Sequence, residues 1–278
     1  MLDTMRSISI NIRQSGKIMK NKIDDKVKNT MEFYDAYPIA SGRFRGGAST
    51  LKMEDIQVAF NELEDKLILD CGCGPGNVSI NILRSVKDLH LISMDLSLNS
   101  LKILKKRQIE DPNKTNNTQI QANVLDFPFN KNSFNFVVAS GVAHHTPEPF
   151  KSLDNLCEAL KEKGKMYFSV YNRNSFYFPE FYTFGTVFRF FYNNKLKRLM
   201  NMSISGFRIL LSKINNHPIS KLDAEKIFAD RYLTPVASFH TKGQITKWSK
   251  RNNTTILKTG KCKLGTLIWF LVRKEANS

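Results

Sequence analysis

The sequence predicts an α/β protein, built on a largely parallel sheet with helices on both faces. Three observations carry this prediction. A short apolar run ends at Asp70 and passes directly into a turn with glycines at positions 72, 74 and 76. From Lys66 onward, short apolar runs alternate with helical patterns, which indicates β-α-β units. A segment rich in aromatic residues, 173–227, interrupts this alternation and predicts an inserted helical cap.

The predicted organisation follows the chain in order. An N-terminal arm and lid occupy 1–50, the first part of the core 51–172, the cap 173–227, and the C-terminal part of the core 228–278. A helical pattern at 51–63 precedes the first strand. Seven strands are predicted, at 66–70, 89–95, 118–122, 135–140, 165–171, 253–260 and 264–273.

Composition limits the class of protein. The 278 residues are 41% hydrophobic, enough for one sizeable core with an appended element. The sequence shows no run of eighteen apolar residues and no leader pattern. Its four cysteines form no disulfide or metal-binding pattern. We therefore expect a cytoplasmic protein without a metal site. The formal charge of +17 leaves an anionic substrate, a membrane surface, a nucleic acid or a composition bias as explanations.

The turn after Asp70 has the features of a ligand-binding turn. Its glycines let a ligand approach the main chain, and Asn77 is expected to cap the following helix and point its positive end at the ligand. A dinucleotide fingerprint fits poorly because its third glycine would fall on Asn77, and a P-loop would need Lys followed by Ser or Thr. A carboxylate from Asp70 in the mouth of the turn favours a cationic ligand.

The second predicted strand supports the same site. It ends in Asp95, nineteen residues after Gly76. A carboxylate at this point can accept hydrogen bonds from both ribose hydroxyls of an adenosine cofactor, as in dinucleotide-binding folds.

The pattern Asp70-x-Gly-x-Gly-x-Gly76 resembles the first motif of class I S-adenosylmethionine (SAM) dependent methyltransferases, and 121–129 and 133–149 resemble their third and fourth motifs, in the type 11/12-like small-molecule family. The resemblance implies a Rossmann-like, doubly wound, seven-stranded sheet with its last strand antiparallel, and SAM as cofactor. The acid that usually meets the adenine amino group is replaced by Asn123, whose side-chain oxygen can still accept one hydrogen bond. The implied cofactor-binding residues are Asp70, Gly72, Gly74, Gly76, Asp95, Leu96, Asn123, Val124 and Ser140.

The fourth motif places two adjacent histidines at the carboxyl end of the sheet, beside the expected cofactor. A neutral imidazole there could accept a proton from the methyl acceptor, so His145 is predicted as the catalytic base, although a role in shaping the pocket stays open. The motif lacks the Asp/Asn/Ser-Pro-Pro-Tyr/Phe signature of amino-directed enzymes, which favours oxygen or carbon acceptors. The predicted substrate-side residues are Tyr34, His144, Tyr171, Tyr232 and His240.

The cap predicts the kind of acceptor. Ten of the seventeen residues 176–192 are Phe or Tyr. They are expected first to form a lid over a hydrophobic acceptor, and second to contact a membrane surface peripherally. The predicted function is methyl transfer to an oxygen or carbon of a small or lipid-like molecule. The alternative is an RNA methyltransferase, because 242–274 contains nine Lys or Arg and no acid, but without a recognisable RNA-binding module nucleic acid is less favoured.

Overall fold

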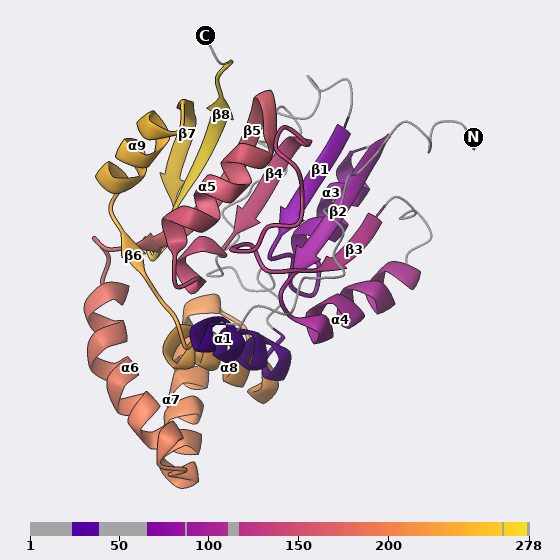
Figure 1. Cartoon of the computed structure of the whole chain (residues 1–278). Coiled ribbons are helices and arrows are strands. Elements are labelled where there is room, and N and C mark those ends of the chain that lie inside the picture. Colours follow the sequence, from indigo (N-terminus) through magenta and orange to yellow (C-terminus); the bar gives the residue numbers. More distant parts are fainter. Residues whose placement is uncertain (1–23, 39–65, 87, 111–116, 263, 277–278) are drawn as a thin grey trace.

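The computed structural model describes residues 24–38, 66–86, 88–110, 117–262 and 264–276. The predicted helix at 51–63 and most of the predicted N-terminal lid lie outside these residues. The described residues form an α/β fold with a central sheet and helices packed on its faces (Figure 1).

The sheet has eight strands in the order β3-β2-β1-β4-β5-β8-β7, with the short strand β6 pairing beside β5. Strands β1 to β5 run parallel to one another, while β8 is antiparallel to both β5 and β7. The predicted doubly wound sheet with an antiparallel last strand is therefore confirmed. The strands are β1 (Lys66–Cys71), β2 (Leu89–Asp95), β3 (Asn117–Gln121), β4 (Phe134–Ser140), β5 (Leu160–Asn172), β6 (Phe239–His240), β7 (Thr254–Lys261) and β8 (Leu267–Lys274).

Two hydrophobic cores cover the two faces of the sheet. Neighbouring residues in a strand point to opposite faces, so Leu69 packs in the core under α5 and α9 while Ile68 packs in the core under α3. Because both faces are buried, the central strands are continuous apolar runs, and this explains why they were recognisable. The helices of these layers are α3 (Asn77–Ser85), α4 (Leu98–Ile109), α5 (Pro149–Ala159) and α9 (Lys242–Arg251).

A second group of helices lies beyond the carboxyl ends of the parallel strands. Figure 1 shows α6 and α7 projecting away from the sheet on this side, with α1 and α8 close to their base. Three of these helices lie within or close to the bounds predicted for the cap. The group comprises α1 (Asp25–Ala36), the 3-10 turn η3 (Ala143–His145), α6 (Tyr177–Asn193), α7 (Lys197–Asn215), α8 (Lys221–Phe228) and the π-helical turn η4 (Ala229–Leu233).

Three local predictions differ from the structure. The cap of α3 is Gly76, at φ 84°, and Asn77 is already the first helical residue, so the predicted cap is wrong by one position. Strand β8 begins at Leu267, later than predicted, because Gly265 (φ 68°) still belongs to the preceding turn. Strand β6 was not predicted, since two residues are too few to show a period.

Candidate active site

A pocket lies at the carboxyl ends of β1, β2 and β4, where the glycine turn, η3, α1 and η4 meet. Eleven of the predicted site residues line it, although they come from distant parts of the chain. They are Tyr34, Gly72, Gly74, Asp95, Leu96, Asn123, Val124, Ser140, His144, His145 and Tyr171. Four others, Asp70, Gly76, Tyr232 and His240, lie outside its lining.

The glycine turn wraps tightly over the end of β2. The amides of Gly72 and Cys73 both donate to the carbonyl oxygen of Met94, at 2.7 and 3.1 Å. Gly72 has a φ of 65°, and a Cβ built on it would lie 2.3 Å from Cγ2 of Val142. A side chain at this position would therefore strain the backbone and collide with the loop after β4, so the turn exposes main chain to the pocket.

Asp95 fastens the turn to the loop after β2. Its Oδ2 accepts from the Gly74 amide and its Oδ1 from the Ser97 amide, both at 2.7 Å. Burial raises the pKa of Asp95 to about 6, although these hydrogen bonds favour the ionised form. The carboxylate is thus held rigidly at the pocket wall, and each oxygen has a second lone pair for a ligand hydroxyl.

Asp70 does not reach the mouth of the turn as predicted. It is 2% exposed, and its Oδ2 lies 2.6 Å from Oγ of Ser79 in α3. Ser79 Oγ also lies 2.9 Å from Ser93 Oγ, and Ser93 donates to Oδ1 of Asn117 at 2.9 Å. Asp70 is therefore directed into the structure, where it joins β1, α3, β2 and β3.

Proton counting indicates the charge state of this buried chain. Each serine hydroxyl has one proton. If Asp70 is ionised, Ser79 donates to it and Ser93 donates to Asn117, so no proton lies between the two serine oxygens. If Asp70 is protonated, its O–H donates to Ser79, Ser79 donates to Ser93, and all three contacts contain a proton. Burial raises the pKa of Asp70 to about 7, in the same direction.

The predicted adenine-side residues occupy one wall of the pocket. The Asn123 side-chain oxygen accepts from the amide of Leu125 at 3.0 Å, so this residue also shapes its own turn. Val124 is buried and lines the pocket beside it. Asp126, the acid within 121–129, is exposed to solvent and does not line the pocket.

His145 has its tautomer set by its surroundings. Nδ1 lies 2.9 Å from the carbonyl oxygen of Val236, and because a carbonyl only accepts, Nδ1 carries the proton. Nε2 then has a free lone pair, which accepts from the Tyr171 hydroxyl at 3.2 Å. Burial lowers the pKa of His145, while Asp230 and the Val236 carbonyl oppose that shift, so the imidazole is neutral near pH 7.

Asp230 is a pocket residue that the sequence analysis missed. Its Oδ1 lies 3.9 Å from Nε2 of His145 and accepts from the Tyr34 hydroxyl at 3.3 Å. Burial raises the pKa of Asp230, and the nearby His145 and Tyr34 counteract part of that shift. The residue lies two positions before Tyr232, which the sequence analysis did name, but the π-helical turn that directs the Asp230 side chain to the pocket has no sequence signal.

Two predicted substrate-side residues point elsewhere. The Tyr232 hydroxyl bonds to Glu180, and its ring packs against Phe188 and Phe228 at the base of α6. His240 lies in β6, with Nε2 2.9 Å from Oγ of Ser238. Both predictions placed the side chain from its position in the sequence, and the local turn of η4 and the pairing of β6 rotate them away from the pocket.

His144 is buried beneath the pocket and stacks on Tyr171, with 3.8 Å between ring centroids. Its Nδ1 has no hydrogen-bond partner within the described part of the chain. Burial is the largest cause that lowers the pKa of His144, and His145 and His240 add to it. A neutral His144 thus forms the floor on which the Tyr171 ring rests.

The pocket contains acids but no cationic side chain among the described residues. Asp95 and Asp230 both line it, whereas no Lys or Arg from the described ranges does. The same ranges contain no cluster of three His, Cys, Asp or Glu side chains that could hold a metal ion. The positive charge of the chain therefore lies away from the described pocket wall.

The cap helices do not form the predicted lid. No residue of 173–227 lines the pocket. Of the ten aromatic residues in 176–192, Tyr177 and Phe181 are buried, and Phe176, Tyr182, Phe184, Phe190 and Tyr192 are exposed. The expectation that these rings cover the acceptor is corrected, because no cap residue is among those that line the pocket, and α6 and α7 project away from the sheet (Figure 1).

The glycine turn, the acid at the end of the next strand and the order of the strands are those expected of a SAM-dependent enzyme. A family profile described as a methyltransferase domain matches residues 69–168. The crystal structure of magnesium protoporphyrin IX methyltransferase from Synechocystis PCC 6803, with bound SAM, has the same fold: TM-score 0.57 and 14% identity, over 92% of this chain and 100% of that one.

Two relatives are similar in sequence. An uncharacterized protein of Methanocaldococcus jannaschii is 30% identical over 194 residues, covering 67% of this chain and 78% of that protein. A ubiquinone/menaquinone biosynthesis C-methyltransferase of Wigglesworthia glossinidia brevipalpis is 26% identical over 158 residues, covering 56% of this chain and 62% of the relative, less than two thirds of its length. The chain belongs to the class I SAM-dependent methyltransferases, and its cofactor is S-adenosylmethionine.

Proposed function

We propose that this methyltransferase transfers its methyl group to an oxygen or carbon atom of a small or lipid-like molecule, which binds at the His145 end of the pocket. The observation that supports this most is the polar cluster of His145, Asp230, Tyr171 and Tyr34, which lines the same pocket as Asp95 and the glycine turn. Such a cluster can orient an acceptor and take up its proton.

SAM would be held by pocket residues other than the His145 cluster. Asp95 would accept from the ribose hydroxyls, and the exposed main chain at Gly72 and Gly74 would contact the amino acid part. Asn123 and Val124 would lie at the adenine. Asp70 and Gly76 would act indirectly, by holding the turn and the start of α3 in place.

His145 would serve as the general base. When bound, SAM supplies an electrophilic methyl group, so the chain must align the acceptor and remove a proton. The neutral His145 can accept that proton at Nε2, directly or through the Tyr171 hydroxyl. The Asp230 carboxylate, 3.9 Å away, would stabilise the imidazolium that forms.

The charges in the pocket restrict the acceptor. Two carboxylates and no cationic side chain among the described lining residues disfavour an acceptor with a phosphate or carboxylate next to the reacting atom. A phenol, an enol or a similar neutral group is compatible with this wall. An anionic acceptor was one possible explanation of the net charge of +17. The described pocket wall gives no support to such an acceptor.

The comparisons agree with a carbon or oxygen acceptor of lipid-like character, since one relative is a C-methyltransferase of ubiquinone and menaquinone biosynthesis. The described helices include none long and apolar enough to cross a membrane. An RNA methyltransferase, the alternative raised by the basic C-terminal residues, gains no support from the acidic pocket wall.

The proposal is tested by incubating the protein with methyl-labelled SAM and a fractionated cell extract. Label in the small-molecule or organic-soluble fraction is expected. With the labelled fraction as substrate, His145→Gln and Asp230→Asn should each lower turnover by about 100-fold, as expected for loss of a positioned proton acceptor or its partner. Binding of S-adenosylhomocysteine, followed by calorimetry, should change less than about threefold in both variants, because neither side chain belongs to the proposed cofactor end.

His217→Gln is the matched control, because His217 is exposed and lies outside the pocket lining. This variant should retain full turnover. Label that appears in RNA instead of small molecules would contradict the proposed acceptor class. Full turnover by His145→Gln would show that His145 only shapes the pocket and is not the general base.

A further inference from the structure

The hairpin formed by α6 and α7, residues 176–215, exposes an unusual amount of apolar surface. Eighteen large apolar side chains are exposed among the described residues, and twelve of them lie in this hairpin. The hairpin also projects from the body of the protein beyond the sheet (Figure 1). Monomeric soluble proteins rarely concentrate exposed apolar residues in this way, so this surface requires a partner.

Helix α7 has two apolar faces, and only one is covered. Its inner face, with Met200, Ile204 and Phe207, packs in the cluster around Phe228 and Tyr232. Its outward side carries exposed apolar residues that the helical period places between about a quarter and half a turn away from Met200. These are Leu199, Met202, Ile209 and Leu210, exposed by 41, 63, 57 and 54%.

Helix α6 repeats this arrangement. Its inner side buries Tyr177, Phe181 and Gly185. The helical period places Phe190 opposite this side and Tyr182 and Val187 on its two flanks, and the exposures of Tyr182, Val187 and Phe190 are 53, 46 and 58%. Both helices therefore present apolar side chains outward after their inner contacts have been satisfied.

The net positive charge of the hairpin favours an anionic partner. Residues 176–215 contain six Lys or Arg and a single acid, Glu180. Glu180 forms a bidentate ion pair with Arg231, with contacts of 2.9 and 2.6 Å, on the inner side. The basic residues Lys195, Lys197 and Arg198 are exposed at the hairpin tip, and Arg208 and Lys213 are exposed along α7.

We propose that the α6–α7 hairpin docks on an anionic lipid bilayer, with its outward aromatic and aliphatic side chains at the acyl boundary and its lysines and arginines among the headgroups. This combination of a broad apolar face with flanking cations is the pattern of interfacial helices. A second copy of the chain fits less well, because a two-fold contact would bring the same cationic surfaces together. The proposal does not depend on the identity of the methyl acceptor.

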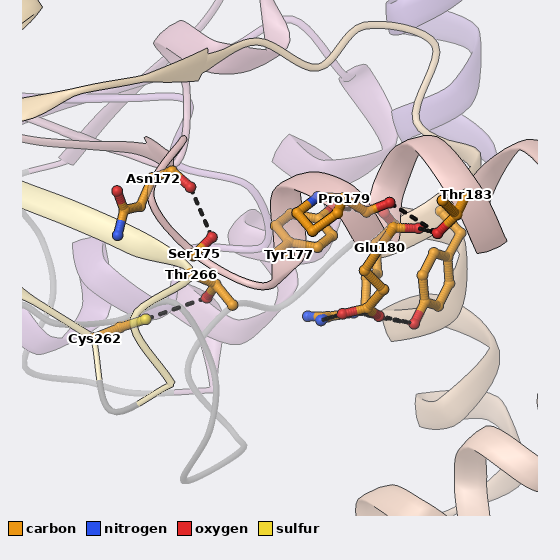
Figure 2. Close-up of polar contacts among 10 residues, drawn as sticks. Asn172, Ser175, Tyr177, Pro179, Glu180, Thr183, Cys262 and Thr266 are labelled. Atoms are coloured by element: carbon orange, nitrogen blue, oxygen red, sulfur yellow. Dashed lines mark hydrogen bonds and ion pairs between the residues drawn. The ribbon is translucent and has the colours of Figure 1, made fainter.

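The hairpin is firmly joined to the pocket wall, so docking would hold the pocket at the membrane. Arg189 of α6 donates to the carbonyl of Tyr232 at 2.9 Å, and Figure 2 shows Glu180 at the base of α6 with its polar contacts to the neighbouring turn. That turn is η4, which carries Asp230 into the pocket.

Vesicle flotation of the full chain tests the proposal. The protein should float with vesicles of equal parts phosphatidylcholine and phosphatidylglycerol, and not with phosphatidylcholine alone. Binding at about 0.1 M salt should be largely lost at about 1 M, because screening shortens the reach of the charges from about 10 to about 3 Å.

Two variants separate the apolar and the charged contributions. The triple change Met202→Gln, Ile209→Gln and Leu210→Gln should lower binding to the anionic vesicles at least about tenfold without altering the charge. In the matched control, Ile109→Gln removes an exposed apolar side chain of α4, which is 76% exposed, and should leave vesicle binding unchanged. Unchanged calorimetric binding of S-adenosylhomocysteine shows that each variant is folded.

The charge variant replaces Lys195, Lys197 and Arg198 with Gln and should also weaken anionic binding at least about tenfold. No flotation with either vesicle, or equal flotation of wild type and both triple variants, would overturn the proposal. A dimer in sedimentation analysis that the apolar variant converts to monomer, without vesicle binding by either, would assign the face to a second copy. Salt-sensitive binding to an RNA oligonucleotide in place of vesicles would also overturn it.

Discussion

Replacing Asp70 with Asn should stabilise the protein at alkaline pH and have little effect at acid pH. Asp70 is 2% exposed and stands at one end of the Ser79, Ser93 and Asn117 hydrogen-bond chain, which has a proton for every contact only when Asp70 is protonated. An Asn amide has the same shape and can donate to Ser79 at every pH. The variant therefore keeps the complete chain and removes the buried charge.

The size of the effect follows from linkage. Burial raises the pKa of Asp70 from an ordinary value of 3.8 to about 7. A carboxyl with a raised folded-state pKa contributes stability below its unfolded pKa, and that contribution is lost as the pH rises through the folded pKa. For pKa values of 3.8 and about 7, the loss is about 4 kcal/mol at full ionisation. The loss should develop between about pH 4 and about pH 8.

Urea unfolding of wild type and Asp70→Asn at a series of pH values measures this effect. Asp95, whose pKa is raised to about 6, titrates in the same range, so the difference between the two unfolding free energies is the informative quantity. It should be near zero at pH 4 and favour the variant by up to about 4 kcal/mol at pH 8. A difference that does not vary with pH, or a variant that is less stable at pH 8, would refute the proton count.

Two further predictions concern the turn itself. Asp95→Ala should weaken S-adenosylhomocysteine binding by about 2 kcal/mol or more, about thirtyfold, because charge-assisted hydrogen bonds are lost. The affinity of Asp95→Asn, measured by calorimetry, should lie between those of Asp95→Ala and wild type. Equal affinities of Asp95→Ala and wild type would contradict the proposed contact with the ribose. Gly76→Ala should lower the unfolding free energy by about 2–4 kcal/mol, since the new Cβ would lie 2.1 Å from Cδ1 of Leu104 at a φ of 84°. Gly141→Ala has a similar φ of 81° but nothing within 4 Å, so it should cost only the conformational part; equal losses would show that the Leu104 collision is relieved.

Which residues line the proposed acceptor end of the pocket depended on the tertiary structure. The sequence predicted Tyr232 and His240 as substrate-side residues, but the residue of this region that lines the pocket is Asp230. The reason is local geometry: a π-helical turn directs Asp230 toward His145, while Tyr232 turns into the aromatic cluster with Phe228. A helical period of 3.6 cannot predict such a turn, since the widened turn changes which side chains share a face.

The exposure of the aromatic segment also depended on the tertiary structure. The sequence determined that 176–192 is a helix dense in Phe and Tyr, but burial energetics favoured a lid. Burial depends on which partners are available: the ends of α6 and α7 extend past the body of the protein, so rings such as Phe184 and Phe190 remain exposed. The amino-acid composition gives the number of apolar side chains, but it cannot show how many of them are buried against other residues in the folded protein.

The order of the main strands and the glycine turn, in contrast, could be predicted from the sequence alone. Buried parallel strands are continuous apolar runs, which can be recognised in the sequence. In the turn, the glycines at alternate positions 72, 74 and 76 have φ values of 65, 52 and 84°, which few other residues adopt, so the turn also has a local sequence pattern. The charge state of Asp70 and the tautomer of His145 have no such signal. They depend on Ser79, Ser93 and Val236, which are brought next to them only when distant segments pack, because pKa values and hydrogen bonds are set by neighbours in space and not by neighbours in sequence.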